Sequence, residues 1–327
     1  MIADTHLAPL PWHISLWQQL YRRHQTGHLP HALLLTGQAG LGKALFASNF
    51  AKTLLCQQPV QQFACQACRD CVWVAAGTHP DLRVLAPEKP GQGIKIDQIR
   101  QVIEKLNHTS QATYKIIVIN PADSLLLAAS QALLKSLEEP SARTLFILVA
   151  EQLERLLPTI RSRCQILRLL PPEKNLAKSW LAQQLPESIA LDKLYYLAAG
   201  APLLAVSYAQ QNYVAFYTDL LTALTQLLNH DLDPIQCAAH YLKTDAQQLL
   251  STLFQIVSEL LKCQLLSGYT VIEDAIPPLA MRMSTSFLLQ YVDEIMKLQA
   301  TTTKITLNLS LMLEDLFSRW ALQGKLC

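Results

Sequence analysis

The 327-residue sequence has little glycine, few charged residues and no long apolar run. Only ten glycines occur, which argues against glycine-rich all-β or low-complexity architectures and favours helix, where glycine is costly. Charged residues make up 16% of the chain and apolar residues 50%, which excludes a disordered protein. The net charge is only +2, so no overall field draws the chain to DNA or to an anionic membrane.

No stretch of about 18 uninterrupted apolar residues occurs, so the sequence predicts no membrane-spanning helix. The first eleven residues include Asp4 and His6 and lack the basic and apolar segments of a secretory signal. We therefore expect a cytoplasmic protein. In that compartment the eight cysteines are free, catalytic or metal-bound, and not paired as disulfides.

Short apolar runs alternate with helical patterns in the first half of the chain, which predicts a parallel α/β sheet. Strands are expected at 31–36, 82–85, 115–119, 145–149 and 165–169, and helices at 43–55, 96–106 and 128–138. Pro171 and Pro172 mark a domain boundary, because the residue before a proline is restricted. Beyond it the patterns are helical, at 176–185, 191–199, 246–266, 286–299 and 305–323. We therefore predict an α/β domain followed by all-α structure, with two or three domains in all.

Four cysteines fall within sixteen residues, with the spacing C-x8-C-x2-C-x2-C: Cys56, Cys65, Cys68 and Cys71. Four thiolates in one loop can close a tetrahedron around Zn²⁺ and leave no position open for substrate, so we favour structural zinc. An iron–sulfur cluster and four unrelated buried thiols are the alternatives. The remaining cysteines are scattered, and we interpret each as a core or surface thiol: Cys164, Cys237, Cys263 and Cys327.

A glycine-rich loop follows the first expected strand and opens a helix, which is the context of a phosphate-binding P-loop. Its glycines would let backbone N–H groups face a phosphate, and its lysine could reach the β- and γ-phosphates; these residues are Gly37, Gly40, Gly42 and Lys43. However, the position after the lysine, where Ser or Thr would hold Mg²⁺, is Ala44.

The strand at 115–119 should end in carboxylates if the chain were an ATPase, because these hold the metal and orient water. Asn120 and Pro121 stand there instead. Asp123 lies two positions further along, and we expect the following helix to turn it away. The sequence thus predicts no ATP hydrolysis. Passive nucleotide binding through Lys43, or a loop that keeps only its tight turn, remain as alternatives.

Four arginines lie within fourteen residues before and in the last expected strand: Arg155, Arg161, Arg163 and Arg168. Surface arginines are usually solvated or salt-bridged, and Glu151 and Glu154 could neutralise part of this cluster. In a P-loop domain, however, an arginine supplied to a neighbour's γ-phosphate stabilises the transferring phosphoryl group.

Several motifs carry a resemblance to a known family: residues 29–37, the four-cysteine loop, Gly77-Thr-His-Pro-Asp81, residues 132–140 and Ser162-Arg-Cys164, with a weaker match at 311–320. In these residues the chain resembles the delta prime family of bacterial clamp loaders, within the AAA+ superfamily. Motor subunits of the loader share some of these motifs. The substitutions at the P-loop separate the chain from them, as does Glu151 or Gln152 at a position where motors carry a small hydroxyl, and the missing arginine in residues 198–203.

The resemblance implies three domains: an AAA+ domain with the zinc module at 1–170, a helical lid at 171–211 and a helical collar at 212–327. It implies structural Zn²⁺ and an arginine finger at Arg163 that serves a neighbouring ATPase subunit. The expected partners are the motor (tau/gamma) and delta subunits, and, through the complex, the sliding clamp and primer-template DNA. The chain would be a non-hydrolysing stator. An active AAA+ motor and a zinc-dependent nucleic-acid-binding module are the alternatives.

Overall fold

The computed structural model describes residues 8–323 except 90, 107–113, 187–189, 270, 272 and 303–308. It divides into two compact units, residues 1–207 and 208–327, which we call the sheet unit and the helical unit. This division lies close to the boundary predicted at 211/212. The sheet unit also contains the helices that follow Pro172, so a separate lid domain stays a prediction.

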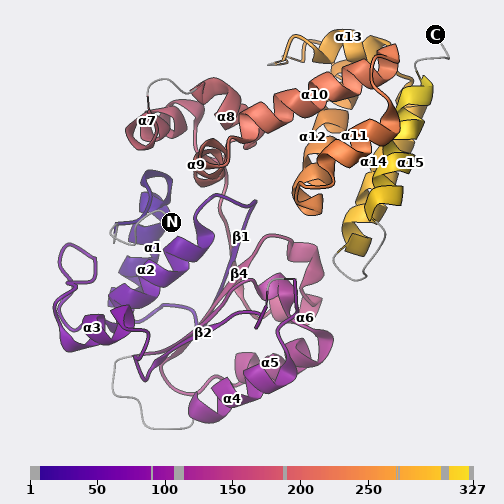
Figure 1. Ribbon diagram of the computed structural model, residues 1–327. Helices are drawn as coiled ribbons and strands as arrows, with labels where there is room; N and C mark the ends of the chain where they lie inside the picture. Colours follow the sequence, from indigo (N-terminus) through magenta and orange to yellow (C-terminus); the bar gives the residue numbers. More distant parts are fainter. Residues whose placement is uncertain are drawn as a thin grey trace. The chain divides into compact units, whose positions relative to one another are not determined.

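A five-stranded parallel sheet forms the centre of the sheet unit (Figure 1). Its strands lie in the order β2-β3-β4-β1-β5. The predicted strands are confirmed to within about one residue at either end. Leu34 of β1 lies opposite Leu148 of β4 and Ile166 of β5, which fixes the register of the central strands. Every residue of β1 and β4 is buried, as expected of a parallel sheet covered on both faces. The strands are β1 Ala32–Thr36, β2 Leu82–Leu85, β3 Lys115–Ile119, β4 Thr144–Ala150 and β5 Gln165–Arg168.

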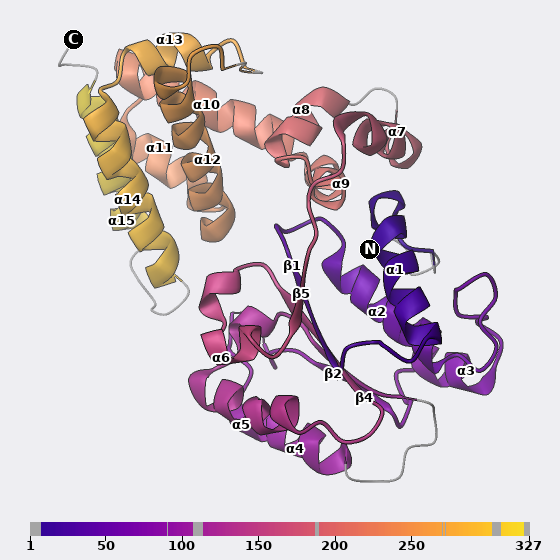
Figure 2. The same cartoon turned by 180° about the vertical axis from the view of Figure 1, so that it is seen from behind.

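Helices cover both faces of this sheet, as the two opposite views show (Figure 2). On one face, Trp17 of α1 (Ile14–Gln25) and Phe46 and Phe50 of α2 (Lys43–Leu55) pack with Leu33 and Leu35. On the other face, α4 (Ile96–Leu106) and α5 (Leu127–Glu138) pack against alternate residues of the same strands. The period of two along β1 therefore divides its leucines between two cores.

Shorter elements complete the sheet unit. These are the 3₁₀ turns η1 (Pro11–His13), η2 (Ala122–Ser124) and η3 (Leu153–Arg155) and the helices α3 (Arg69–Ala75), α6 (Pro158–Arg161), α7 (Lys174–Gln184) and α8 (Leu191–Leu197). Helix α9 (Pro202–Gln210) contains the point at which the two units divide. The helices predicted between residues 176 and 199 are thus confirmed.

The described part of the helical unit contains only helices, as predicted: α10 Tyr213–Asn229, α11 Pro234–Tyr241, α12 Ala246–Leu265, α13 Ile276–Met281, α14 Thr285–Thr302 and α15 Leu309–Leu322. The first residues of the helix predicted at 305–323 lie outside the described ranges. The fully buried Trp320 donates its indole N–H to the Leu224 carbonyl at 2.9 Å, which joins α15 to α10. None of the described helices is long and apolar enough to cross a bilayer.

Candidate functional site

The predicted P-loop runs from the end of β1 to the start of α2, where parallel α/β folds bind ligands. Gly40 and Gly42 adopt left-handed φ values of 75° and 86°. A Cβ on Gly40 would lie 2.4 Å from the Cβ of Leu204, so only glycine fits there. The Leu203 N–H donates to the Gly40 carbonyl at 3.0 Å. The start of α9 therefore lies directly against the loop.

Lys43, the lysine of this loop, is 4% exposed, and its ammonium is paired with other groups of the same chain. Its Nζ donates to the Gln38 carbonyl at 2.7 Å and lies 3.7 Å from Oε1 of Glu151. Burial lowers the pKa of Lys43, while the negative charges of Glu151 and Asp123 act in the opposite direction. The predicted loop residues are brought together, and Glu151 is a partner that the sequence analysis did not assign to Lys43.

Asp123 corrects one prediction, because its carboxylate is not turned away. The turn η2 brings it to the end of β4, where Oδ2 accepts the backbone N–H groups of Glu151 at 3.2 Å and Gln152 at 3.0 Å. Strands β3 and β4 are neighbours, so residues just after them meet at one sheet edge. Asp123 thus ties two loops together and adds negative charge near Lys43.

The positions that would hold Mg²⁺ carry neither the hydroxyl nor the carboxylates of an ATPase site. Ala44 is an exposed methyl in the first turn of α2. After β3, the Asn120 N–H donates to the Leu85 carbonyl at 2.9 Å, which continues the strand pairing to this residue. Asn120 and Pro121 therefore stand at the edge of the sheet where an ATPase needs carboxylates.

Arg163, the arginine of the Ser162-Arg-Cys164 motif, follows α6 and is half-buried. Its Nη2 forms an ion pair with Oε1 of Glu138 at 2.5 Å, and Nη1 donates to the Thr159 carbonyl at 3.0 Å. Glu138 is the last residue of α5, within the 132–140 motif. Two of the motifs therefore meet through this ion pair.

The other three arginines lie on different elements: Arg155 in η3, Arg161 at the end of α6 and Arg168 at the end of β5. Cys164, beside Arg163, is buried in the core, and burial raises the pKa of its thiol to about 12. Cys237 is likewise buried, while Cys263 is half-buried. These are the core or surface thiols that the spacing predicted, whereas Cys327 lies outside the described residues.

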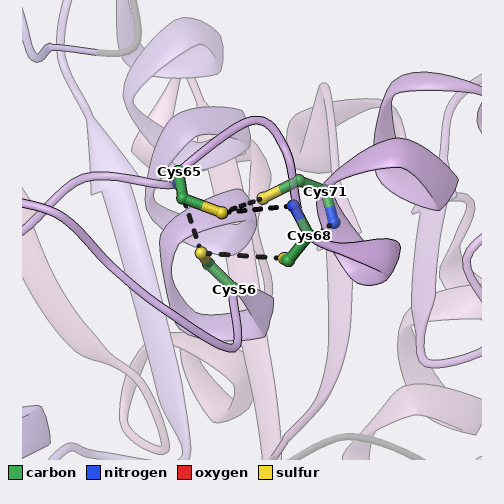
Figure 3. A group of neighbouring side chains, drawn as sticks. All are labelled: Cys56, Cys65, Cys68 and Cys71. Carbon is green, nitrogen blue, oxygen red and sulfur yellow. Dashed lines mark hydrogen bonds between the residues drawn. The ribbon is translucent and has the colours of Figure 1, made fainter.

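The four clustered cysteines come from the end of α2, the loop after it and the start of α3. Their side chains point toward one another (Figure 3). All four Sγ atoms lie within 4.8 Å of one another, with 3.9 Å between Cys56 and Cys68 and 4.0 Å between Cys65 and Cys71. A tetrahedral ion with Zn–S bonds of about 2.3 Å requires sulfur separations of about 3.8 Å. The residues therefore fit a metal ion.

Backbone donors support this cluster. The N–H groups of Cys65, Cys68 and Cys71 each donate to the sulfur of the preceding cysteine, at 3.2, 3.3 and 3.5 Å. Backbone N–H groups of Ala67 and Cys68 lower the pKa of the Cys65 thiol to about 6. Donors that favour a thiolate favour metal binding, because the thiolate is the ligand.

His79 and Asp70 form a buried polar pair between the cysteine cluster and β2. The sequence alone assigned His79 no role beyond its place in the motif at 77–81. Nδ1 of His79 accepts the Asp81 N–H at 3.0 Å, and Nε2 lies 3.6 Å from Oδ1 of Asp70. Burial lowers the pKa of His79, so the ring is neutral at neutral pH. The motif at 77–81 therefore fixes the turn between α3 and β2.

The strand order and the loop at the end of β1 define the class: this is a P-loop protein of the AAA+ type, with a cysteine loop inserted between α2 and α3.

Residues 12–173 match the family model described as DNA polymerase III, delta subunit. A DNA polymerase III subunit delta' of Yersinia pestis is 34% identical over 296 residues, 87% of each chain. Those of Pseudomonas aeruginosa and Escherichia coli K12 are 43% and 40% identical over 198 and 202 residues, or 60% of the length of either relative. The chain belongs to the DNA polymerase III delta' family.

Proposed function

We propose that this chain is a clamp-loader subunit that does not hydrolyse ATP and that lends Arg163 to a neighbouring ATPase subunit. The family membership supports its place in a clamp loader. Its partners there would be the motor (tau/gamma) and delta subunits, and the complex would act on the sliding clamp and primer-template DNA. The observation that carries the proposal is Lys43, which is bound to Gln38 and Glu151 beside a loop without magnesium ligands.

Hydrolysis of a nucleotide needs a metal that bridges its phosphates and a group that orients the attacking water. The methyl of Ala44 cannot bind Mg²⁺, and neither Asn120 nor Pro121 is a carboxylate. Asp123 is held by two backbone N–H groups of the next loop. Moreover, the carboxylate of Glu151 lies near the ammonium that would otherwise meet a phosphate. The site therefore favours neither ATP binding nor turnover.

A turnover assay on the purified chain tests this half of the proposal. We expect magnesium-dependent ATP hydrolysis at background, with no change on Lys43→Ala. The single variant Ala44→Thr should stay inactive, because it restores one metal ligand and leaves Asn120 and Glu151 in place. Turnover comparable to that of a motor subunit, abolished by Lys43→Ala, would instead identify an active ATPase.

The proposed role of Arg163 in a neighbouring ATPase site is supported by its position after α6 and by the exposure of its side chain. Its side chain is 34% exposed and that of Glu138 is 48% exposed. An ion pair between groups so exposed contributes about 0–1 kcal/mol, so a neighbour's phosphate can compete for the guanidinium at little cost. In the free chain, Glu138 and the Thr159 carbonyl hold Arg163 in one orientation. A positioned arginine is what a transition-state contact in trans requires.

The cysteine cluster would hold structural Zn²⁺ through Cys56, Cys65, Cys68 and Cys71. Four thiolates complete a tetrahedral site and leave no coordination position for substrate. Bound there, the ion would supply folding energy to a loop that has little apolar core of its own. The lid at 171–211 and the collar at 212–327 complete the proposed stator, with the collar as the assembly domain.

A further inference from the structure

A cavity of about 680 Å³ lies in the sheet unit, beside the cysteine cluster and far along the chain from Arg163. Its wall is built from α2, the cysteine loop with α3, and the edge strand β2. Its volume is that of a site for a small organic molecule, which is usually a few hundred to a thousand Å³. Neither the P-loop nor the arginine motif contributes to it.

Two cations line the cavity, Lys52 from α2 and Arg83 from β2. The residues that line it include no carboxylate. Nη1 of Arg83 donates to the carbonyls of His79 at 2.9 Å and Leu82 at 2.8 Å, which fixes the plane of the guanidinium. Lys52 is half-buried, and the described residues offer its ammonium no hydrogen bond or ion pair. Two positive charges therefore share one concave site.

The neighbouring charges do not account for this pair. Asp70 lies near Arg69 and His79, at 3.8 Å and 3.6 Å, and Asp81 is buried beside His79. Four thiolates on a divalent ion would carry a net charge of −2. However, the sulfurs of Cys56, Cys65 and Cys68 accept the backbone N–H groups of Cys65, Cys68 and Cys71 at 3.2, 3.3 and 3.5 Å. The donors that serve these sulfurs are thus backbone groups.

The rest of the wall combines polar and apolar groups, and its apolar side chains include Ala64, Val74, Leu82 and Val84. A ligand that matches both parts has an anionic end and an apolar body. Lysine and arginine together recognise phosphate, the arginine through its planar fork and the lysine as a point charge. We propose that this cavity binds an organic phosphate, with the phosphate at Lys52 and Arg83 and the apolar part against α3 and β2.

Phenyl phosphate is a suitable probe, and phenol and inorganic phosphate are its two halves. We would titrate each into the full-length, metal-loaded, ¹⁵N-labelled chain and follow the amide resonances. We expect saturable shifts at Ala64, Gly77 and Val84, with a Kd of about 1 mM or tighter for phenyl phosphate. Each half should bind at least about tenfold more weakly, because it meets only one part of the wall.

Lys52→Gln should weaken phenyl phosphate binding about tenfold or more. It removes no hydrogen bond or ion pair among the residues that the structure describes. Lys135→Gln on α5, which does not line the cavity, is the matched control and should change nothing. Arg83→Lys keeps the charge but loses the fork, so it should weaken binding less than Arg83→Gln. The proposal is overturned if Lys52→Gln binds like the wild type, if phenol binds as tightly as phenyl phosphate, or if the shifts map to Lys43 and the P-loop.

Discussion

Replacing Lys43 with methionine tests whether the buried ammonium of Lys43 lowers the free energy of unfolding. Methionine has a similar length and no charge, so Lys43→Met keeps most of the packing and removes the buried ammonium. Glu151→Gln is the complementary change, because it removes the carboxylate and leaves the ammonium buried. Glu151→Gln should lower the free energy of unfolding, whereas Lys43→Met should not.

The magnitudes follow from the contact between Nζ of Lys43 and Oε1 of Glu151 at 3.7 Å. At that distance two unit charges attract by about 1 kcal/mol in water and by about 4 kcal/mol at an effective dielectric of about 20. The Glu151 side chain is 53% exposed, so the lower figure applies. We therefore expect Glu151→Gln to lower the free energy of unfolding by about 1 kcal/mol. Lys43→Met should leave it unchanged or raise it by about 1 kcal/mol, because desolvation of the ammonium is relieved.

The effect should also depend on pH. The folded chain lowers the pKa of Lys43 below its usual value of about 10.5. Between the two values the unfolded state binds more protons, so raising the pH through this window stabilises the fold. The free energy of unfolding of Lys43→Met relative to that of the wild type should therefore fall as the pH rises toward about 10.5.

Urea unfolding followed by tryptophan fluorescence would measure these differences. Four of the five tryptophans lie in the sheet unit: Trp12, Trp17, Trp73 and Trp180. The reasoning is refuted if Lys43→Met costs several kcal/mol, or if its effect relative to the wild type is the same at neutral and at alkaline pH.

Two further predictions concern the metal cluster and the loop. Cys65→Ser should reduce bound zinc, measured by elemental analysis, well below one ion per chain, and it should lower the thermal midpoint of unfolding. The control variant Cys263→Ser, at a half-buried cysteine outside the cluster, should do neither. Iron in place of zinc, with visible absorbance, would contradict the zinc assignment. Gly40→Ala should lower the free energy of unfolding in urea by about 2–4 kcal/mol, because its Cβ would clash with Leu204 and its φ is 75°. Gly27→Ala, at a φ of 72° with nothing within 4 Å of the added Cβ, should lower it by about 1 kcal/mol. Equal losses would show that α9 does not press on the loop.

The strands and the cysteine cluster could be predicted from sequence because their signals are local. The run at 115–119, for example, has both faces buried in a parallel sheet, and such strands read as continuous apolar segments. The spacing of Cys56, Cys65, Cys68 and Cys71 required only one loop to close on itself.

The orientation of Asp123 could not be predicted in this way. It depends on β3 and β4 being neighbours, which brings residues about thirty positions apart in sequence into contact. The same holds for the pairing of Lys43 with Glu151 and of Arg163 with Glu138. Similarly, Lys52 and Arg83 share a cavity only because α2 and β2 meet beside α3. Spacing along the chain carries no information about such pairs.

ATP hydrolysis by a reconstituted clamp loader with Arg163→Ala is the most direct test of the proposed function. In a complex where only the adjacent motor subunit can hydrolyse ATP, we expect the rate to fall by about 10³ or more while the subunits stay assembled. Arg161→Ala, an arginine two positions earlier, is the matched control and should hydrolyse ATP at the wild-type rate. An Arg163→Ala complex that hydrolyses ATP and loads the clamp as fast as the wild type would contradict the account.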